Sequence, residues 1–209
     1  MALDHARDFF HIGAMSSSPT DLASTTPALF LTRWITHLCA PVFALLAGLG
    51  AGLRLQRPVE TPARVSRYLW TRGLWLILLE MTVMRLGLAF SLSPAWPLLL
   101  LVLWMLGLSM IVLAALVRVP PRVLLGLGAI VIASHNLLDG VRSADLGPFG
   151  WAWTLLHQPG AIVAGAAVAV VGYPLVPWVA VTMVGFGLRS LTCGPDTTAS
   201  ASSRARASS

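Results

Sequence analysis

The sequence predicts an all-α protein, a polytopic transmembrane helix bundle with about five spans. Of the 209 residues, 56% are hydrophobic and only 11% are charged, whereas soluble domains carry about 25% charged residues. Several apolar stretches reach the roughly 20 residues that a helix needs to cross a bilayer. A soluble fold could not bury so much apolar surface, so we expect residues 1–191 to form one membrane domain.

Five apolar segments define the predicted spans. The first three are long enough to cross a bilayer, whereas the fourth is short and ends in polar residues. Pro174 and Pro177 interrupt the fifth, so we expect a leading segment followed by one final helix. In the first segment we expect a kink at Pro41, and Gly48 and Gly52 form a GxxxG pattern that permits close helix approach. The five segments are approximately residues 28–53, 68–92, 97–117, 123–138 and 161–191.

The arginines predict the orientation of the spans, because cytoplasmic loops accumulate basic residues. Arginines recur in residues 54–67, 118–122 and 189–206. They are scarce in residues 1–27, 91–96 and 139–159. We therefore expect the N-terminus outside, the C-terminus in the cytoplasm, and an inner-membrane location. The net charge of +6 reflects this topology, so no nucleic-acid partner is expected.

The remaining sequence features predict neither a soluble enzyme nor a metal site. Cys39 and Cys193 lie far apart and indicate no disulfide framework or metal centre. No serine elbow, phosphate-binding loop, HExxH or CxxC motif occurs in the chain. The tail, residues 192–209, is rich in Ser, Ala and Arg, and we expect it to be disordered.

Ionisable side chains within predicted spans are costly to bury, and each one suggests a structural pair or a functional site. Glu80 lies near the middle of the second span, and we predict a structural ion pair with Arg72 or Arg85, or with Arg33 of the first span. Breaking such a buried pair costs about 3–5 kcal/mol. His37 follows Arg33 by one helical turn and is a secondary site candidate.

Three polar residues gather at the outer end of the fourth span. They are His135, Asn136 and Asp139. A polar helix end at the membrane surface explains them without a function, and we favour that interpretation. His135 and Asp139 stay secondary candidates for a site on the outer side.

The richest polar segment is the N-terminus, which contains Asp4, His5, Asp8 and His11. In a helix, Asp4, Asp8 and His11 would share one face. A carboxylate beside an imidazole fixes its tautomer and raises its basicity, as a general base near neutral pH requires. The alternative is a solvated helix end at the membrane surface, where charge runs are common.

Several segments resemble the catalytic-domain family of heparan-alpha-glucosaminide N-acetyltransferase, in particular its bacterial members. These segments occur in the family's order and extend from Met1 to about Leu191. They are MALDHARDFFH, TDLASTTPALFLTRWITHLCAPVFALLAG, TRGLWLILLE, VLWMLGLSMI, SHNLLD and YPLVPW. Family members carry a further helix before the first of these segments, and larger ones continue after the last, so the chain looks truncated at both ends.

The resemblance implies an acetyltransferase that takes acetyl groups from cytosolic acetyl-CoA and delivers them to a sugar amine or hydroxyl across the membrane. The expected partners are the lipid bilayer and a glycan acceptor, with acetyl-CoA as donor and no metal. His5 is the position most similar to the family's active-site histidine, and His11 is the second choice. Asp4 and Asp8 would orient the histidine or tune its basicity. The histidine would act either as a general base or through an acyl-histidine intermediate.

Two other functions remain compatible with the sequence. A non-catalytic membrane protein, or an inactive fragment, would use the same spans to pack against a partner. A small-solute transporter would place charges such as Arg72 and Glu80 along its pathway. An inverted repeat would favour transport, and the sequence has none that we recognise.

Overall fold

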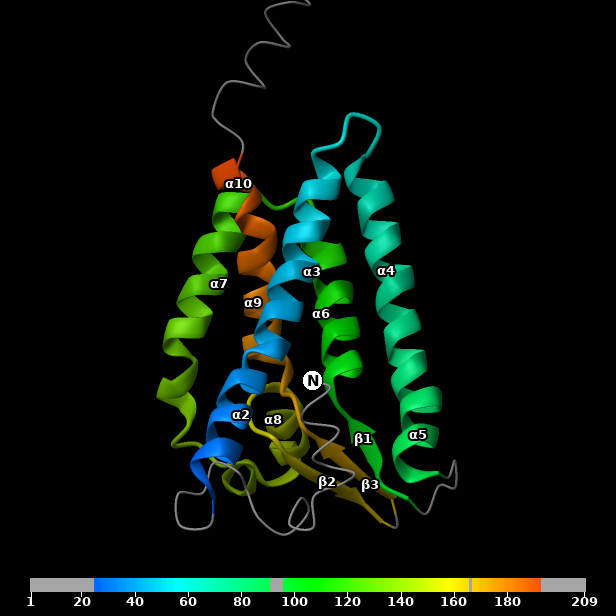
Figure 1. Cartoon of the computed structure of the whole chain (residues 1–209), viewed down its shortest axis with the longest axis vertical. Helices are drawn as coiled ribbons and strands as arrows, with labels where there is room; N and C mark the ends of the chain where they lie inside the picture. Colours follow the sequence, from blue (N-terminus) through cyan, green and yellow to red (C-terminus); the bar gives the residue numbers. More distant parts are fainter. Residues whose placement is uncertain (1–24, 91–95, 166, 193–209) are drawn as a thin grey trace, which may run out of the picture. The chain divides into compact units, whose positions relative to one another are not determined.

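The computed structural model describes residues 25–90, 96–165 and 167–192, which are mostly helical, as predicted. The chain divides into two compact units, Met1–Phe43 and Ala44–Ser209. In Figure 1 the second unit combines long helices with one small sheet. The predicted catalytic segment at the N-terminus lies outside the described residues. So does the predicted disordered tail, except for Thr192, which ends a short helix.

The first predicted span forms two consecutive helices, α2 (Pro27–His37) and α3 (Cys39–Leu55). The Thr26 side chain caps α2 by accepting the N–H of Leu29. The two helices are separated at Leu38, three residues before the expected kink. Pro41 has no N–H to donate to the carbonyl of residue 37, which explains an interruption at this point. Together the helices are long and apolar enough to cross a membrane.

The second predicted span is an uninterrupted run of helix. It comprises α4 (Pro62–Leu79), the π-helical turn η1 (Glu80–Met84) and α5 (Arg85–Ala89). The Thr61 side chain caps its start by accepting the N–H of Arg64. The run stops at Phe90, whose φ of 50° is left-handed. Single π-helical turns within α-helices often mark functional sites.

The third predicted span is shorter than expected, because its first residues form a strand. Strand β1 (Leu98–Leu100) precedes α6 (Val102–Leu116). The prediction of one helix over residues 97–117 was therefore wrong at its start. A short apolar run does not distinguish a buried strand from a helix, and only its pairing decides.

The fourth predicted span is α7 (Pro121–His135), continued by the 3-10 turn η2 (Asn136–Leu138). Its combined length and composition also suffice to cross a membrane. The following segment, predicted as an outer loop, folds into the 3-10 helix η3 (Ser143–Phe149) and the short helix α8 (Gly150–Leu156).

The fifth predicted segment begins with a β-hairpin and ends with one main helix. Strands β2 (Gly160–Ala164) and β3 (Ala167–Val171) are antiparallel, and β3 also pairs in parallel with β1. The sheet order is β1-β3-β2. Helix α9 (Leu175–Gly187) starts directly after Pro174, and α10 (Arg189–Thr192) follows it.

Glycines allow the helices of the second unit to pack closely. A β-carbon on Gly73 of α4 would lie 2.6 Å from the carbonyl oxygen of Gly107 on α6. Gly48, in the GxxxG pattern of α3, lies against the backbone of Thr182 on α9. The predicted close approach at this pattern is therefore observed. The core between these helices includes Val65, Leu69, Leu113, Leu124 and Phe186, all nearly inaccessible.

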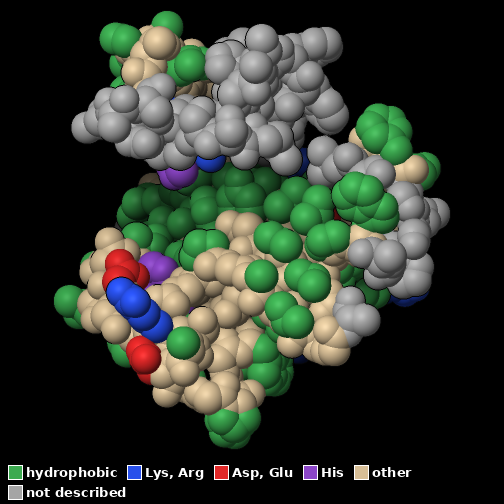
Figure 2. All heavy atoms as spheres, turned by 90° about the horizontal axis from the view of Figure 1, so that it is seen from below, with side chains coloured by type: hydrophobic (Ala, Val, Ile, Leu, Met, Phe, Trp, Pro, Cys, Tyr) green, Lys and Arg blue, Asp and Glu red, His purple; other side chains and the backbone are tan. Residues whose placement is uncertain are grey.

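Large apolar side chains also cover the outside of the second unit. Trp75 is 57% exposed and Ile130 is 64% exposed, and many other Leu, Val and Trp side chains resemble them. Figure 2 shows hydrophobic side chains interspersed with backbone and other side chains on the described surface at the end where the strands lie. Such a surface suits lipid better than water. Among the described residues, two stretches have the length and composition of a membrane span, namely α2–α3 and α7–η2. Helices α6 and α9 are apolar but shorter. The count of five spans therefore stays a prediction.

Candidate functional site

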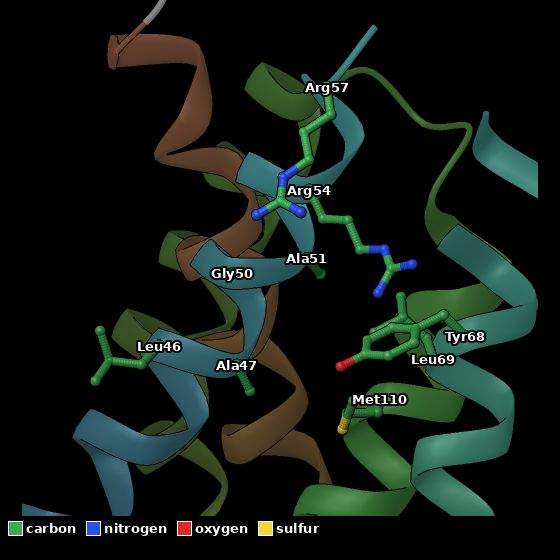
Figure 3. Close-up of a pocket in the computed structure, with 9 residues that line it drawn as sticks. All are labelled: Leu46, Ala47, Gly50, Ala51, Arg54, Arg57, Tyr68, Leu69 and Met110. Carbon is green, nitrogen blue, oxygen red and sulfur yellow. The ribbon is translucent and has the colours of Figure 1, made fainter. Parts of the chain in front are cut away.

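An arginine-lined cavity of about 340 Å³ lies between α3, α4 and α6. Figure 3 shows Arg54 and Arg57 near the end of α3, above the ring of Tyr68 from α4. The rest of its lining is small or apolar, consisting of Leu46, Ala47, Gly50, Ala51, Leu69 and Met110. All these residues belong to the second unit.

Two arginines lie near the ring of Tyr68, which lines this cavity. The guanidinium carbon of Arg54 is 4.0 Å from the centre of the Tyr68 ring, and that of Arg72 is 5.5 Å away. The Arg54 Nε and a terminal nitrogen donate to Glu60 Oε1 at 2.9 and 2.8 Å. Glu60 therefore holds Arg54 over the ring.

A second hollow, of about 570 Å³, continues along α4. It is lined by Tyr68, Arg72, Trp75, Leu76, Leu79 and Met110. Because Tyr68 and Met110 line both hollows, the two adjoin. We call this combined feature the arginine groove. It has cations at one end and an apolar wall along α4.

Glu80, expected in an ion pair, caps a helix. Its side chain leaves α4–η1 and its Oε2 accepts the N–H groups of Leu103 and Trp104 at 2.8 and 3.2 Å. These are among the first N–H groups of α6, which have no partner within their own helix. Glu80 is only 3% exposed. A carboxylate here also complements the positive end of the helix dipole.

The predicted arginine partners of Glu80 have other contacts. Arg72 lies near the Tyr68 ring, and a terminal nitrogen of Arg85 donates to the carbonyl oxygen of Trp96 at 3.0 Å. The ion pair itself stays a prediction. The cap could not be predicted from the sequence, because residues 80 and 103 are brought together only by the packing of α4 against α6.

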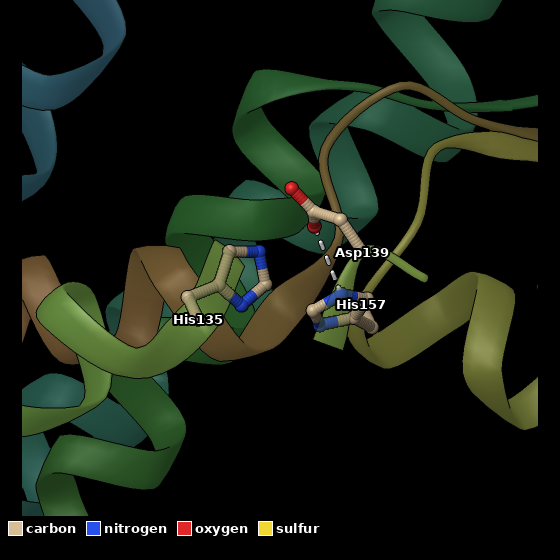
Figure 4. A group of neighbouring side chains, drawn as sticks. All are labelled: His135, Asp139 and His157. Carbon is tan, nitrogen blue, oxygen red and sulfur yellow. Dashed lines mark ion pairs between the residues drawn. The ribbon is translucent and has the colours of Figure 1, made fainter. Parts of the chain in front are cut away.

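A second polar group gathers at the opposite end of the bundle, where His135, Asp139 and His157 point toward one another (Figure 4). His135 ends α7, Asp139 follows η2, and His157 follows α8. The imidazole rings are 4.1 Å apart between centres, and His157 Nε2 is 3.3 Å from Asp139 Oδ1. We call these three residues the histidine cluster.

The histidine cluster was only partly foreseen. His135 and Asp139 were secondary candidates, but His157 was missed. Its one sequence signal is a lone histidine at the end of an aromatic segment, GWAWTLLH, which is usually uninformative. The third histidine candidate, His37, is exposed at the end of α2 in the first unit.

The catalytic candidates Asp4, His5, Asp8 and His11 lie outside the described residues, so their roles stay predictions. A family model described as heparan-alpha-glucosaminide N-acetyltransferase, catalytic, matches residues 9–208. This range contains both the arginine groove and the histidine cluster. No curated protein and no solved structure matches the chain significantly.

Proposed function

Because the chain belongs to the heparan-alpha-glucosaminide N-acetyltransferase catalytic family, we propose that it is a membrane-embedded acetyltransferase. It takes the acetyl group from cytosolic acetyl-CoA and transfers it to a sugar amine or hydroxyl on the outer side. The observation that carries this proposal beyond the family match is the arginine groove, which suits the donor.

The groove matches the chemistry of acetyl-CoA along its length. The donor has an adenine nucleotide with several phosphate charges at one end and a long, flexible arm ending in a thioester at the other. Arginine binds phosphate through charge-assisted, bidentate hydrogen bonds and stacks on aromatic rings. Arg54, Arg57 and Arg72 supply such groups around Tyr68. The apolar wall at Trp75 and Leu79 would accommodate the arm.

The proposed reaction needs one proton acceptor. The acceptor nitrogen or oxygen attacks the thioester carbonyl, the carbon–sulfur bond breaks, and CoA leaves as the thiolate. A histidine removes the proton from the attacking group, as general base. An acyl-histidine intermediate would use the same residue as nucleophile. By resemblance this is His5, with Asp4 and Asp8 orienting it and His11 as second choice.

Replacing Arg57 with alanine tests the donor site. Arg57 is exposed and lines the groove, so its loss should spare the fold. We expect the KM for acetyl-CoA to rise about tenfold, because a hydrogen bond to a charged group contributes about 1.5–3 kcal/mol. The kcat should change little, since Arg57 would contact the nucleotide equally in the ground state and in the transition state. Steady-state kinetics in purified membranes measures both.

Arg118→Ala is the matched control, because Arg118 is also an exposed arginine but does not line the groove. It should leave the KM unchanged. Equal KM values for the Arg57 variant, the control and the unmodified protein would remove the groove as the donor site.

The proposed orientation places the groove at the cytoplasmic face. Figure 1 shows the α3–α4 connection, the α6–α7 connection and α10 at one end of the second unit, with the sheet at the other. The Gln56 side chain donates to the carbonyl oxygen of Arg189 at 3.2 Å, which joins two of these arginine-rich segments. Such segments face the cytoplasm in membrane proteins.

Reporter fusions test this orientation and the five proposed spans. Alkaline phosphatase, which is active only outside the cytoplasm, should be inactive when fused within residues 54–67. It should be active when fused within residues 139–159. The reverse pattern, or activity at both places, would contradict the cytoplasmic location of the donor site.

A further inference from the structure

The histidine cluster has the donor atoms and the geometry of a metal site. We propose that His135, Asp139 and His157 bind one zinc ion. This site lies at the end of the second unit opposite the cationic end of the arginine groove, and it goes beyond the proposed transferase function. No metal was expected from the sequence, because Cys39 and Cys193 lie far apart and no HExxH or CxxC motif occurs in the chain.

The fold holds the three ligands together by contacts that need no metal. The Trp153 Nε1 and Gln158 Nε2 donate to the carbonyl oxygen of Val141 at 2.9 and 2.8 Å. Gln158 also accepts the N–H of Ser143 at 3.3 Å. These bonds fasten the segment after Asp139 to the end of α8, where His157 lies. The ligands are therefore brought together before an ion binds.

Two imidazole nitrogens in the cluster are buried and form no hydrogen bond. The His157 side chain is 3% exposed, and its Nε2 lies near Asp139 without forming a hydrogen bond. His135 Nδ1 is also buried without a hydrogen bond. Burying a polar atom without a hydrogen bond is costly, and a bound ion is one of the recognised ways to satisfy it. A cation between the two rings and the carboxylate would satisfy both nitrogens.

The ligand set favours zinc among common metal ions. Each residue offers one ligand atom, and these atoms all lie within 4.8 Å of one another. In a tetrahedral zinc site, with metal–nitrogen distances of about 2.0–2.1 Å, neighbouring ligand atoms are roughly 3.3 Å apart. A small inward movement would complete the site. Two imidazoles and one carboxylate suit zinc, whereas calcium and magnesium prefer oxygen ligands.

Three protein ligands leave a fourth position for water or for an oxygen or nitrogen of a bound molecule. The Asp139 side chain is 63% exposed, so ions can reach the cluster from solvent. The Trp153 ring lies 4.6 Å from the His157 ring and covers one side. The site therefore combines a buried ligand, an accessible ligand and an aromatic wall.

Zinc titration of the purified full chain in detergent, after treatment with a chelator, tests the proposal. Competition with a zinc indicator gives the affinity, and elemental analysis gives the stoichiometry. We expect one zinc per chain. Asp139→Asn should weaken zinc binding about tenfold or more, and His157→Ala about 100-fold or more, because even supporting residues of metal sites contribute about 10–100-fold. Zinc should also raise the melting temperature of the unmodified protein, and less so that of Asp139→Asn.

Two matched variants make the result specific. His37→Ala removes an exposed imidazole elsewhere and should keep full affinity. His5→Ala should also keep zinc although it loses acetyl transfer, so that failure of this proposal and failure of the proposed function are distinguishable. Because Asp139 is exposed, its replacement should not prevent folding. Equal zinc binding by the unmodified protein and Asp139→Asn, or no binding by the unmodified protein, would overturn the proposal.

Discussion

Replacing His5 with alanine should lower acetyl transfer from acetyl-CoA about 10²–10⁴-fold, the usual contribution of a positioned acid or base. The reason is that the attacking amine or hydroxyl must lose a proton as the thioester carbonyl is attacked. His5 stands beside Asp4 in the segment that resembles the family's active-site element. Transfer of labelled acetyl groups by membranes, normalised to the amount of inserted protein, measures the effect.

His11→Ala is the control for this experiment and should cost less activity. A segment that served only as a membrane-surface anchor would give another pattern, with similar modest losses for both histidines and larger ones for Phe9 and Phe10. If His5→Ala kept near-normal activity, the assignment would be wrong, and His135 would become the leading candidate. If membranes with the unmodified protein transferred no more acetyl than membranes without it, the non-catalytic interpretation would be favoured.

Replacing Glu80 with alanine should lower the free energy of unfolding more than any of the other substitutions proposed above. The change leaves the N–H groups of Leu103 and Trp104 without their acceptor at the start of α6. A lost helix cap costs about 0.5–2 kcal/mol, and hydrogen bonds to a charged group contribute about 1.5–3 kcal/mol each. We therefore expect a loss of about 3 kcal/mol, seen as a lower melting temperature and a lower folded yield in membranes.

Two further variants separate a structural role of Glu80 from a catalytic one. Glu80→Gln keeps an acceptor oxygen and should reduce stability by less than the alanine variant. Thr82→Ala, at an exposed position of the same π-helical turn, should change little. If Glu80→Gln left yield and melting temperature unchanged yet eliminated acetyl transfer, Glu80 would belong to the active site instead.

Helix positions could be predicted from the sequence because they depend on local composition. Apolar length located a helix within each of the five predicted segments, although α4 begins six residues before the predicted second span and α6 begins five residues after the start of the third. Pro41 marked the interruption near Leu38. The strands could not be predicted in this way. Leu98–Leu100 becomes a strand only because β3, far along the chain, pairs with it. The residues themselves are equally compatible with a helix.

The candidate sites likewise combine features that are visible in the sequence with contacts that only the folded chain creates. The sequence by itself determined the membrane-type composition, the arginine-rich segments and the family resemblance, and it singled out Glu80, His135 and Asp139 as candidates, because each is a property of one local segment. Only the tertiary structure decided that Glu80 caps α6 and that His157 joins His135 and Asp139. These contacts join helices distant in sequence, and a side chain's partner there depends on how the helices pack, which local composition does not specify.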